Sequence, residues 1–285
     1  MARCLSKVFL SLCGLAYLSM VLAALTPMFS FAQSGLVVRP VYVFIDAPMK
    51  STVVTVRNDG DGPVEVTADV RYGYHVSDDT GKVSLVYPES LSADDRSMQS
   101  WVRAYPQRFV IGPLESQGVR IYATPPAGTS PGEYWGKMLF TPHPTKSPKQ
   151  KNKGPALEVV SALEVPLHYR LGAVSTGVEL DNIADAAFSN QVVQARAHFR
   201  RTGNASFWGR LRCRVLDHAG KSVGSLDRNL VVYKDFNVRV KIDVSATSSG
   251  PYTLEMVAET KRDDIALKQL VRADSRRWTF PVTIQ

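Results

Sequence analysis

The sequence has only three cysteines, and two of them, Cys4 and Cys13, lie within the first 32 residues. Cys213 is the third, and one cysteine cannot form an internal disulfide. The chain after residue 32 must therefore be held together by burial of apolar side chains. Cys213 lies in the stretch 211–216, which we interpret as part of a strand, and there we expect a small buried hydrophobe rather than a reactive thiol.

Catalytic and metal-binding motifs are also missing. There is no Gly-x-Ser-x-Gly motif and no glycine-rich phosphate loop that leads into a helix. The histidines show no metal-type pairing, and a single cysteine does not make a closed zinc site; they are His75, His143, His168, His198 and His218. We expect no enzyme, no metal, no cofactor and no small-molecule substrate.

The first 32 residues have the three zones of a secretory signal peptide. Arg3 and Lys7 supply positive charge, residues 8–25 are apolar, and Ser30 and Ala32 are small residues at positions −3 and −1 of a cleavage site. We predict a signal peptide over residues 1–32 and export to the periplasm. The alternative is a retained membrane anchor, because the apolar run approaches the length of a span.

The charge of the chain is positive, at +8, and it falls to +6 when Arg3 and Lys7 are subtracted. Several lysines crowd into the proline-rich stretch 142–155, which is typical of a solvated loop. Export and this local clustering both argue against a nucleic-acid partner.

Apolar and polar residues alternate as in β-strands, for example over residues 64–70, and turn residues separate such runs every 8–12 residues. This pattern predicts an all-β fold with two tandem immunoglobulin-like β-sandwich domains after a signal peptide. We place them at residues 33–171 and 172–285. Tyr134 and Tyr252 each begin a late strand, where such sandwiches carry a corner tyrosine. Residues 75–99 read as a long polar loop around a short strand, and 263–273 is the best, weak helical candidate.

Several segments, in order, resemble the periplasmic pilus-assembly chaperones of Gram-negative bacteria. They include residues 36–40, the strand and turn at 54–60, residues 106–113, residues 132–134 and the long strand 156–170. The resemblance covers most of the first domain. It implies a protein that lends the last strand of this domain to a fibre subunit whose own sandwich lacks a strand.

In this chain the lent strand would be residues 157–165. Leu157, Val159, Leu163 and Val165 share one face of it. The same alternation would also arise from a strand that faces the core of its own domain, and the sequence does not separate the two interpretations.

Two positions depart from the family pattern, which anchors the terminal carboxylate of the subunit with an arginine and a lysine. Tyr42 and Pro166 occupy these positions, and neither can make a charge-assisted bond. The anchor is therefore absent or rebuilt, and Arg39, His168 and Arg170 are the candidates for a rebuilt one.

We therefore expect a periplasmic chaperone-like protein that binds a fibre or pilus subunit by strand donation, with an outer-membrane usher as the second partner that the resemblance implies. The alternative is a secreted or envelope structural or adhesive module without chaperone activity. A hydrolase on a sandwich scaffold would need convergent acids or histidines, which the sequence does not show.

Overall fold

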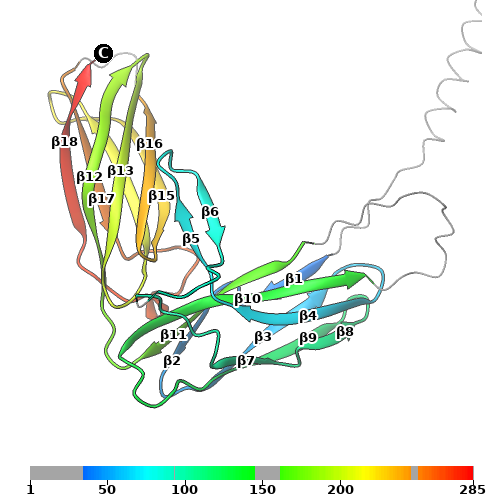
Figure 1. Ribbon diagram of the computed structural model, residues 1–285. Helices are drawn as coiled ribbons and strands as arrows, with labels where there is room; N and C mark the ends of the chain where they lie inside the picture. Colours follow the sequence, from blue (N-terminus) through cyan, green and yellow to red (C-terminus); the bar gives the residue numbers. More distant parts are fainter. Residues whose placement is uncertain (1–34, 93, 145–160, 245–249, 285) are drawn as a thin grey trace, which may run out of the picture. The chain divides into compact units, whose positions relative to one another are not determined.

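The computed structural model describes residues 35–92, 94–144, 161–244 and 250–284 (Figure 1). The predicted signal peptide, residues 1–32, lies outside them. The regular secondary structure of the described residues is β-strand apart from one short 3-10 turn, which confirms the predicted fold class. The weak helical candidate at 263–273 contains only a short 3-10 turn, Leu267–Gln269. None of the helical structure in the described ranges has the length and apolar character to cross a membrane.

The first sandwich consists of two sheets whose inner faces share one apolar core. Its four-stranded sheet has the order β1 (Leu36–Arg39), β3 (Ser51–Asn58), β9 (Ser116–Ala123) and β7 (Val102–Tyr105). Its five-stranded sheet has the order β2 (Val43–Asp46), β11 (Leu163–Leu171), β10 (Gly132–Pro144), β4 (Val64–Arg71) and β8 (Arg108–Ile111).

The alternating sequence of β4 shows why these segments form a sandwich. Val64, Val66, Ala68 and Val70 are buried in the core, while the residues between them face outward. This two-residue period matches the pleat of a strand that is covered on one side. The turn before β4 is held by Asn58, whose buried side-chain amide donates to three backbone carbonyls and whose Oδ1 accepts from a backbone N–H.

The second sandwich is a seven-stranded sheet that surrounds its own core. Its order is β15 (Ser222–Val232), β14 (Phe207–Leu216), β17 (Tyr252–Glu259), β18 (Arg276–Ile284), β12 (Thr176–Ser189), β13 (Val192–Gly203) and β16 (Asp235–Asp243). β18 and β12 pair over a short stretch only, and side chains from both sides of that junction meet in one cluster. Cys213 is fully buried in this cluster, as the sequence predicts.

Three strand predictions need correction. Residues 75–99 hold a β-hairpin, β5 (Tyr74–Ser77) and β6 (Val83–Val86), where a loop with one short strand was expected. β15 begins at Ser222, although the sequence favours a strand only over residues 230–233. In the described residues β11 begins at Leu163, so residues 161 and 162 are not in the strand that was predicted to run through them.

Tyr134 forms a tyrosine corner. Its hydroxyl donates a 2.8 Å hydrogen bond to the carbonyl of Ser130, four residues earlier in the chain. Tyr252 begins β17 and packs in the second core against Phe188. The boundary near residue 172 stays a prediction, because residues Ser34–Gln285 form one compact unit.

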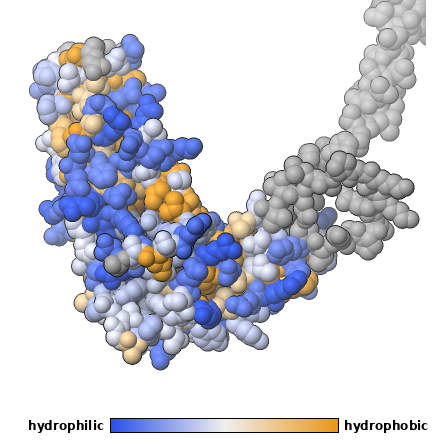
Figure 2. Space-filling view, viewed as in Figure 1, coloured by the Kyte–Doolittle hydropathy of each residue, from blue (hydrophilic) through white to orange (hydrophobic). Residues whose placement is uncertain are grey.

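The surface is mainly hydrophilic in the view of Figure 2, with hydrophobic residues gathered in smaller patches. Among the exposed large apolar side chains, Val53, Tyr122 and Tyr105 lie on the neighbouring strands β3, β9 and β7, and Val110 lies on β8 of the other sheet. Exposure of a few apolar side chains is usual for a folded protein and does not by itself define a binding surface.

Candidate functional site

β11, the strand that the sequence predicts to be lent, has an incompletely paired edge. It pairs with β10 along its whole length, from Leu163 to Leu171. On its other side it pairs with β2 only over Leu167–Arg170. In the described part of the chain no strand pairs with that side of residues 163–166, so the sheet has a free edge there.

The predicted donor side chains lie in different environments. Val165 is buried in the core of its own sandwich, and Leu163 is half-buried against the same core. Leu157 and Val159 lie outside the described residues. Glu164 projects on the opposite face of the strand, where its carboxylate accepts a hydrogen bond from the Tyr87 hydroxyl. The lending role of this set stays a prediction.

The three candidates for a rebuilt anchor do not come together. Arg39 is exposed at the end of β1, in the other sheet. His168 and Arg170 lie on the same face of β11 and are buried, and both are bound to the same internal carboxylate, that of Glu133. The anchor role of these residues stays a prediction.

Glu133 is the centre of this buried network, and the sequence analysis did not single it out. Its Oε2 accepts a 2.9 Å hydrogen bond from Nε of Arg170, and its Oε1 lies 3.1 Å from Nδ1 of His168. Arg170 also contacts Asp46 at 3.5 Å and lies over the ring of Phe44. The guanidinium thus supplies the positive charge that a fully buried carboxylate requires.

The network continues into residues of the second sandwich. Oε1 of Glu133 accepts from the backbone N–H and the hydroxyl of Ser206, and the Ser206 hydroxyl accepts from the indole N–H of Trp208 at 2.9 Å. The Tyr233 hydroxyl lies 3.4 Å from Nε2 of His168, and the two rings stack. Every polar group of the network thus has a partner, as buried polar groups require.

Burial and charge set the protonation of the network. Burial lowers the pKa of His168, so the ring is neutral at neutral pH, with Nδ1–H donating to Glu133 and Nε2 accepting from Tyr233. Burial alone would raise the pKa of Glu133, but His168, Arg170 and the Ser206 hydroxyl together lower it to about 2. Glu133 is therefore ionised at all physiological pH values.

Tyr42, which stands where the family pattern has an arginine, contacts an arginine from the second sandwich. Its hydroxyl donates a 3.0 Å hydrogen bond to Asp264 and lies 3.5 Å from the Arg262 guanidinium. Arg262 is bound to Asp264 and lies over the rings of Tyr42 and Trp208. The guanidinium next to the start of β2 is therefore that of Arg262, which comes from the second sandwich.

Lys137 is a second buried polar residue that was not among the residues predicted for the site. It is on the same face of β10 as Glu133 and Trp135, and it is 1% exposed. Its Nζ has no hydrogen-bond partner among the described residues, and burial lowers its pKa to about 8. A lysine inside the apolar run 134–140, in phase with Trp135, was the signal that could have found it.

Residues that could hold a metal are not grouped in the described ranges, where no cluster of three or more histidine, cysteine or acidic side chains occurs.

The sequence matches no protein-family model and no curated protein. By structure, the chain is similar to solved pilus chaperones over most of its length. The SafB chaperone with the SafA pilin of Salmonella enterica has 14% identity and a TM-score of 0.45, covering 87% of this chain and 97% of the other. The CsuC–CsuE chaperone–tip adhesion subunit complex of Acinetobacter baumannii has 16% identity and a TM-score of 0.41, covering 88% and 99%.

The CupB2 chaperone of Pseudomonas aeruginosa has 12% identity and a TM-score of 0.39, covering 87% of this chain and 100% of the other. The binding of a pilin or a tip adhesion subunit is a property of SafB and CsuC. The function of this chain has to be argued from its own residues.

Proposed function

We propose that this protein is a periplasmic chaperone that binds a fibre or pilus subunit by adding the start of β11 to the incomplete sandwich of that subunit. The observation that carries the proposal is the free edge at residues 163–166, on a strand whose other half is paired on both sides. Unpaired edge N–H and C=O groups are a template for pairing with another chain. Adding a strand to an incomplete sheet uses this template.

The apolar face of the strand supports the same proposal. Val165 lies in the core of its own sandwich and Leu163 packs against that core. In the sequence, Val159 and Leu157 have the same parity as Leu163 and Val165, with Ser161 between the two pairs, so in an extended chain they would share this face. In the proposal, Val165 and Leu163 stabilise the chaperone itself. Val159 and Leu157 fill the apolar groove of the client subunit.

Proline at 166 fits a strand with a free edge. Proline has no N–H to donate to a ladder, and it is tolerated in strands where one side is unpaired. Pro166 lies opposite Lys137 of β10 and just before the residues that pair with β2. The strand therefore changes from a one-sided to a two-sided pairing at this residue.

The alternative is a structural or adhesive module of the envelope without chaperone activity. The burial of Val165 in its own core favours it, since a strand that serves only its own domain has the same pattern. The two proposals differ in the partner: the chaperone forms a transient heterodimer with a monomeric subunit, whereas the module is itself part of a polymer.

The test is affinity capture of the full chain from the periplasmic fraction, with mass spectrometry of what is retained. We expect a small β-rich subunit, and we expect Val159→Asp to abolish its capture because a charge cannot enter an apolar groove. Val110→Asp is the matched control, since Val110 is exposed on β8, the opposite edge of the same sheet.

Retention of the subunit by Val159→Asp would refute strand donation by this face. Recovery of the protein only as a polymer of itself would favour the structural module. Absence of the protein from the periplasm would refute the predicted signal peptide at residues 1–32.

A further inference from the structure

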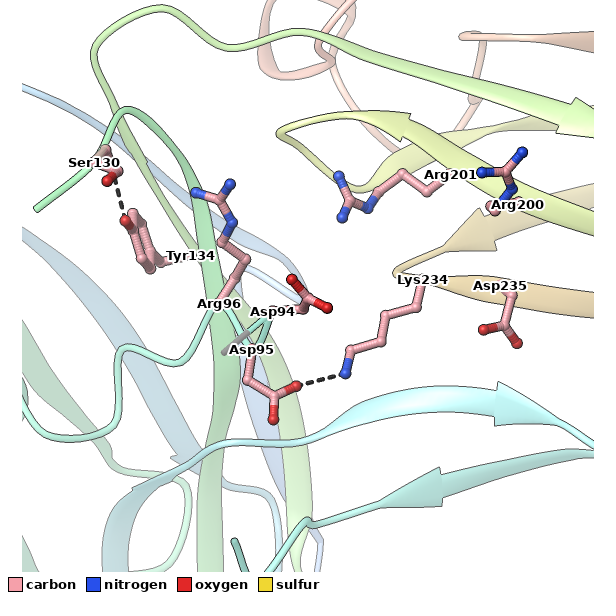
Figure 3. Close-up of a pocket in the computed structure, with 9 residues that line it drawn as sticks. All are labelled: Asp94, Asp95, Arg96, Ser130, Tyr134, Arg200, Arg201, Lys234 and Asp235. Carbon is pink, nitrogen blue, oxygen red and sulfur yellow. Dashed lines mark hydrogen bonds and ion pairs between the residues drawn. The ribbon is translucent and has the colours of Figure 1, made fainter. Parts of the chain in front are cut away.

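A pocket of about 470 Å³, outside the strand-donation site, is lined by charged side chains from both sandwiches (Figure 3). One wall is formed by residues 94–96 and the start of β10. The other wall is formed by the end of β13 and the turn between β15 and β16. The basic residues among its lining are Arg96, Arg200, Arg201 and Lys234.

Two of these four cations are neutralised within the protein. Nζ of Lys234 lies 2.6 Å from the carboxylate of Asp95. Nε of Arg200 lies 3.0 Å from the carboxylate of Asp181. Neither group is free to bind an added anion.

Arg96 and Arg201 differ from them. In the described residues, neither guanidinium has a carboxylate within ion-pair distance. Nε of Arg201 donates to the carbonyl of Tyr233 at 2.6 Å, and its Nη1 donates to the carbonyl of Gly203. Nη1 of Arg96 donates to the carbonyl of Pro131 at 3.4 Å. Neutral carbonyls orient the two groups but form no ion pair with either of them.

The two arginines face the same space. In Figure 3 their side chains extend toward one hollow from opposite walls. Arg201 is partly buried; burial and the nearby charge of Arg96 lower its pKa, while the charges of Glu133 and, less strongly, Asp94 oppose this effect. Asp94 is exposed and makes no ion pair among the described residues.

The backbone holds both arginines in place. The carbonyl of Arg96 accepts a 2.9 Å hydrogen bond from the N–H of Trp135 on β10. The N–H of Arg201 donates a 2.8 Å hydrogen bond to the carbonyl of Lys234. The Arg96 guanidinium packs against Gly132, where a Cβ atom would lie 2.5 Å from Nη1. The site is thus built before any ligand arrives, which reduces the entropy lost on binding.

We propose that Arg96 and Arg201 form a binding site for a single oxyanion group, a carboxylate or a phosphate. A planar guanidinium presents two parallel N–H donors to such a group, and two guanidiniums share its charge. Binding an oxyanion removes the repulsion between the two like charges. None of the residues that line this pocket belongs to β11, so the proposed site does not depend on strand donation.

The experiment is calorimetric titration of the full chain with sodium phosphate and, separately, with N-acetylglutamate, at constant ionic strength maintained with sodium chloride. We expect saturable binding of at least one of them. Arg96→Gln and Arg201→Gln should each weaken it by about tenfold or more, which corresponds to the loss of one charge-assisted contact of about 1.4 kcal/mol. The matched control is Arg120→Gln, an exposed arginine on β9.

The two ligands separate the sources of the oxyanion. Binding of N-acetylglutamate supports an acidic side chain of a bound protein, and binding of phosphate alone supports a free inorganic anion. Absence of saturable binding with both ligands overturns the proposal. So does an equal loss in Arg120→Gln, which would indicate diffuse attraction by the net positive charge. If Arg201→Gln fails to fold, as judged by circular dichroism, Arg96→Gln decides the outcome, because among the described residues the Arg96 guanidinium makes one long hydrogen bond, to the carbonyl of Pro131, besides its contact with the ring of Tyr134.

Discussion

Lys137 on β10 lies directly opposite Pro166 on β11, and its ammonium group is buried without a hydrogen-bond partner among the described residues. β5 of the hairpin packs against β10. Burial lowers the pKa of Lys137, and among the described residues the acid that opposes this effect is Glu164, which accepts a hydrogen bond from Tyr87. A desolvated charge without a bonded partner destabilises the folded state.

Lys137→Met should therefore stabilise the protein. Methionine fills a similar volume without a charge. A pKa lowered from 10.5 to about 8 corresponds to about 3 kcal/mol, and we expect a gain of this order at pH 7. Urea unfolding of the variant and the parent measures it, with Lys50→Met at an exposed position as the control.

The gain should depend on pH. Because the pKa of Lys137 is lower in the folded state, the cost is fully present below about pH 8 and disappears as the pH rises toward 10.5. The difference in unfolding free energy between Lys137→Met and the parent should shrink over this interval. A constant difference would mean that Lys137 is not desolvated.

Glu133→Gln should destabilise the protein by about 3–5 kcal/mol, because it leaves the buried guanidinium of Arg170 without its counter-ion. Chemical denaturation gives the value. Glu89→Gln, at an exposed position, should change it by less than about 0.5 kcal/mol. A loss as small as that of the control would show that Arg170 finds another acceptor.

Acid should remove the contribution of Glu133. The pKa of Glu133 is lower in the folded state than in the unfolded state. Its contribution to folding stability is therefore fully present above about pH 4.5 and is lost as the pH falls toward 2. His168 adds to the loss, since burial lowers its pKa and the unfolded chain takes up the proton first. The difference between the parent and Glu133→Gln, measured by unfolding at several pH values, should fall below pH 4.5.

Tyr42→Arg should destabilise the protein more than Tyr42→Phe. Phenylalanine removes only the hydroxyl that donates to Asp264, at a cost of about 1 kcal/mol. Arginine adds a second guanidinium beside Arg262 and removes the ring that packs on Trp208. Thermal unfolding ranks the two variants. If Tyr42→Arg were as stable as the parent, the guanidinium of Arg262 could not lie next to residue 42.

Cys213 should react with thiol reagents only after unfolding. It is fully buried, and burial raises the pKa of its thiol to about 12. A colorimetric thiol assay of the folded protein without residues 1–32, which contain Cys4 and Cys13, should show no rapid phase. The same assay in urea should show reaction at this residue, and fast reaction in the folded state would contradict its burial.

The all-β class, most strands and the corner role of Tyr134 could be predicted from the sequence, because alternation and turn residues act over a few neighbouring positions. The hairpin β5–β6 was harder to predict. Its residues are half-buried or exposed throughout, so they show no two-residue period. The length of β15 was underestimated for a similar reason. Its residues before 230 are half-buried or exposed.

The candidate site was predicted in part. The sequence indicated β11 as the strand of interest and showed that Tyr42 and Pro166 depart from the family pattern. It did not indicate the partners of the polar residues on that face. Glu133, Ser206 and Tyr233 are far from His168 and Arg170 in the chain, and no spacing rule connects them.

By itself, the sequence determined the strand pattern, the reliance on apolar cores and the face on which each strand residue lies, because these follow from local periodicity and composition. Only the tertiary structure decided that β2 pairs with half of β11 and that, among the described strands, none pairs with the same side of residues 163–166. It also brought Arg262 to Tyr42, and Arg96 and Arg201 to one pocket. The reason is that pairing and charge neutralisation depend on residues that are distant in the chain and that meet only when both sandwiches have folded.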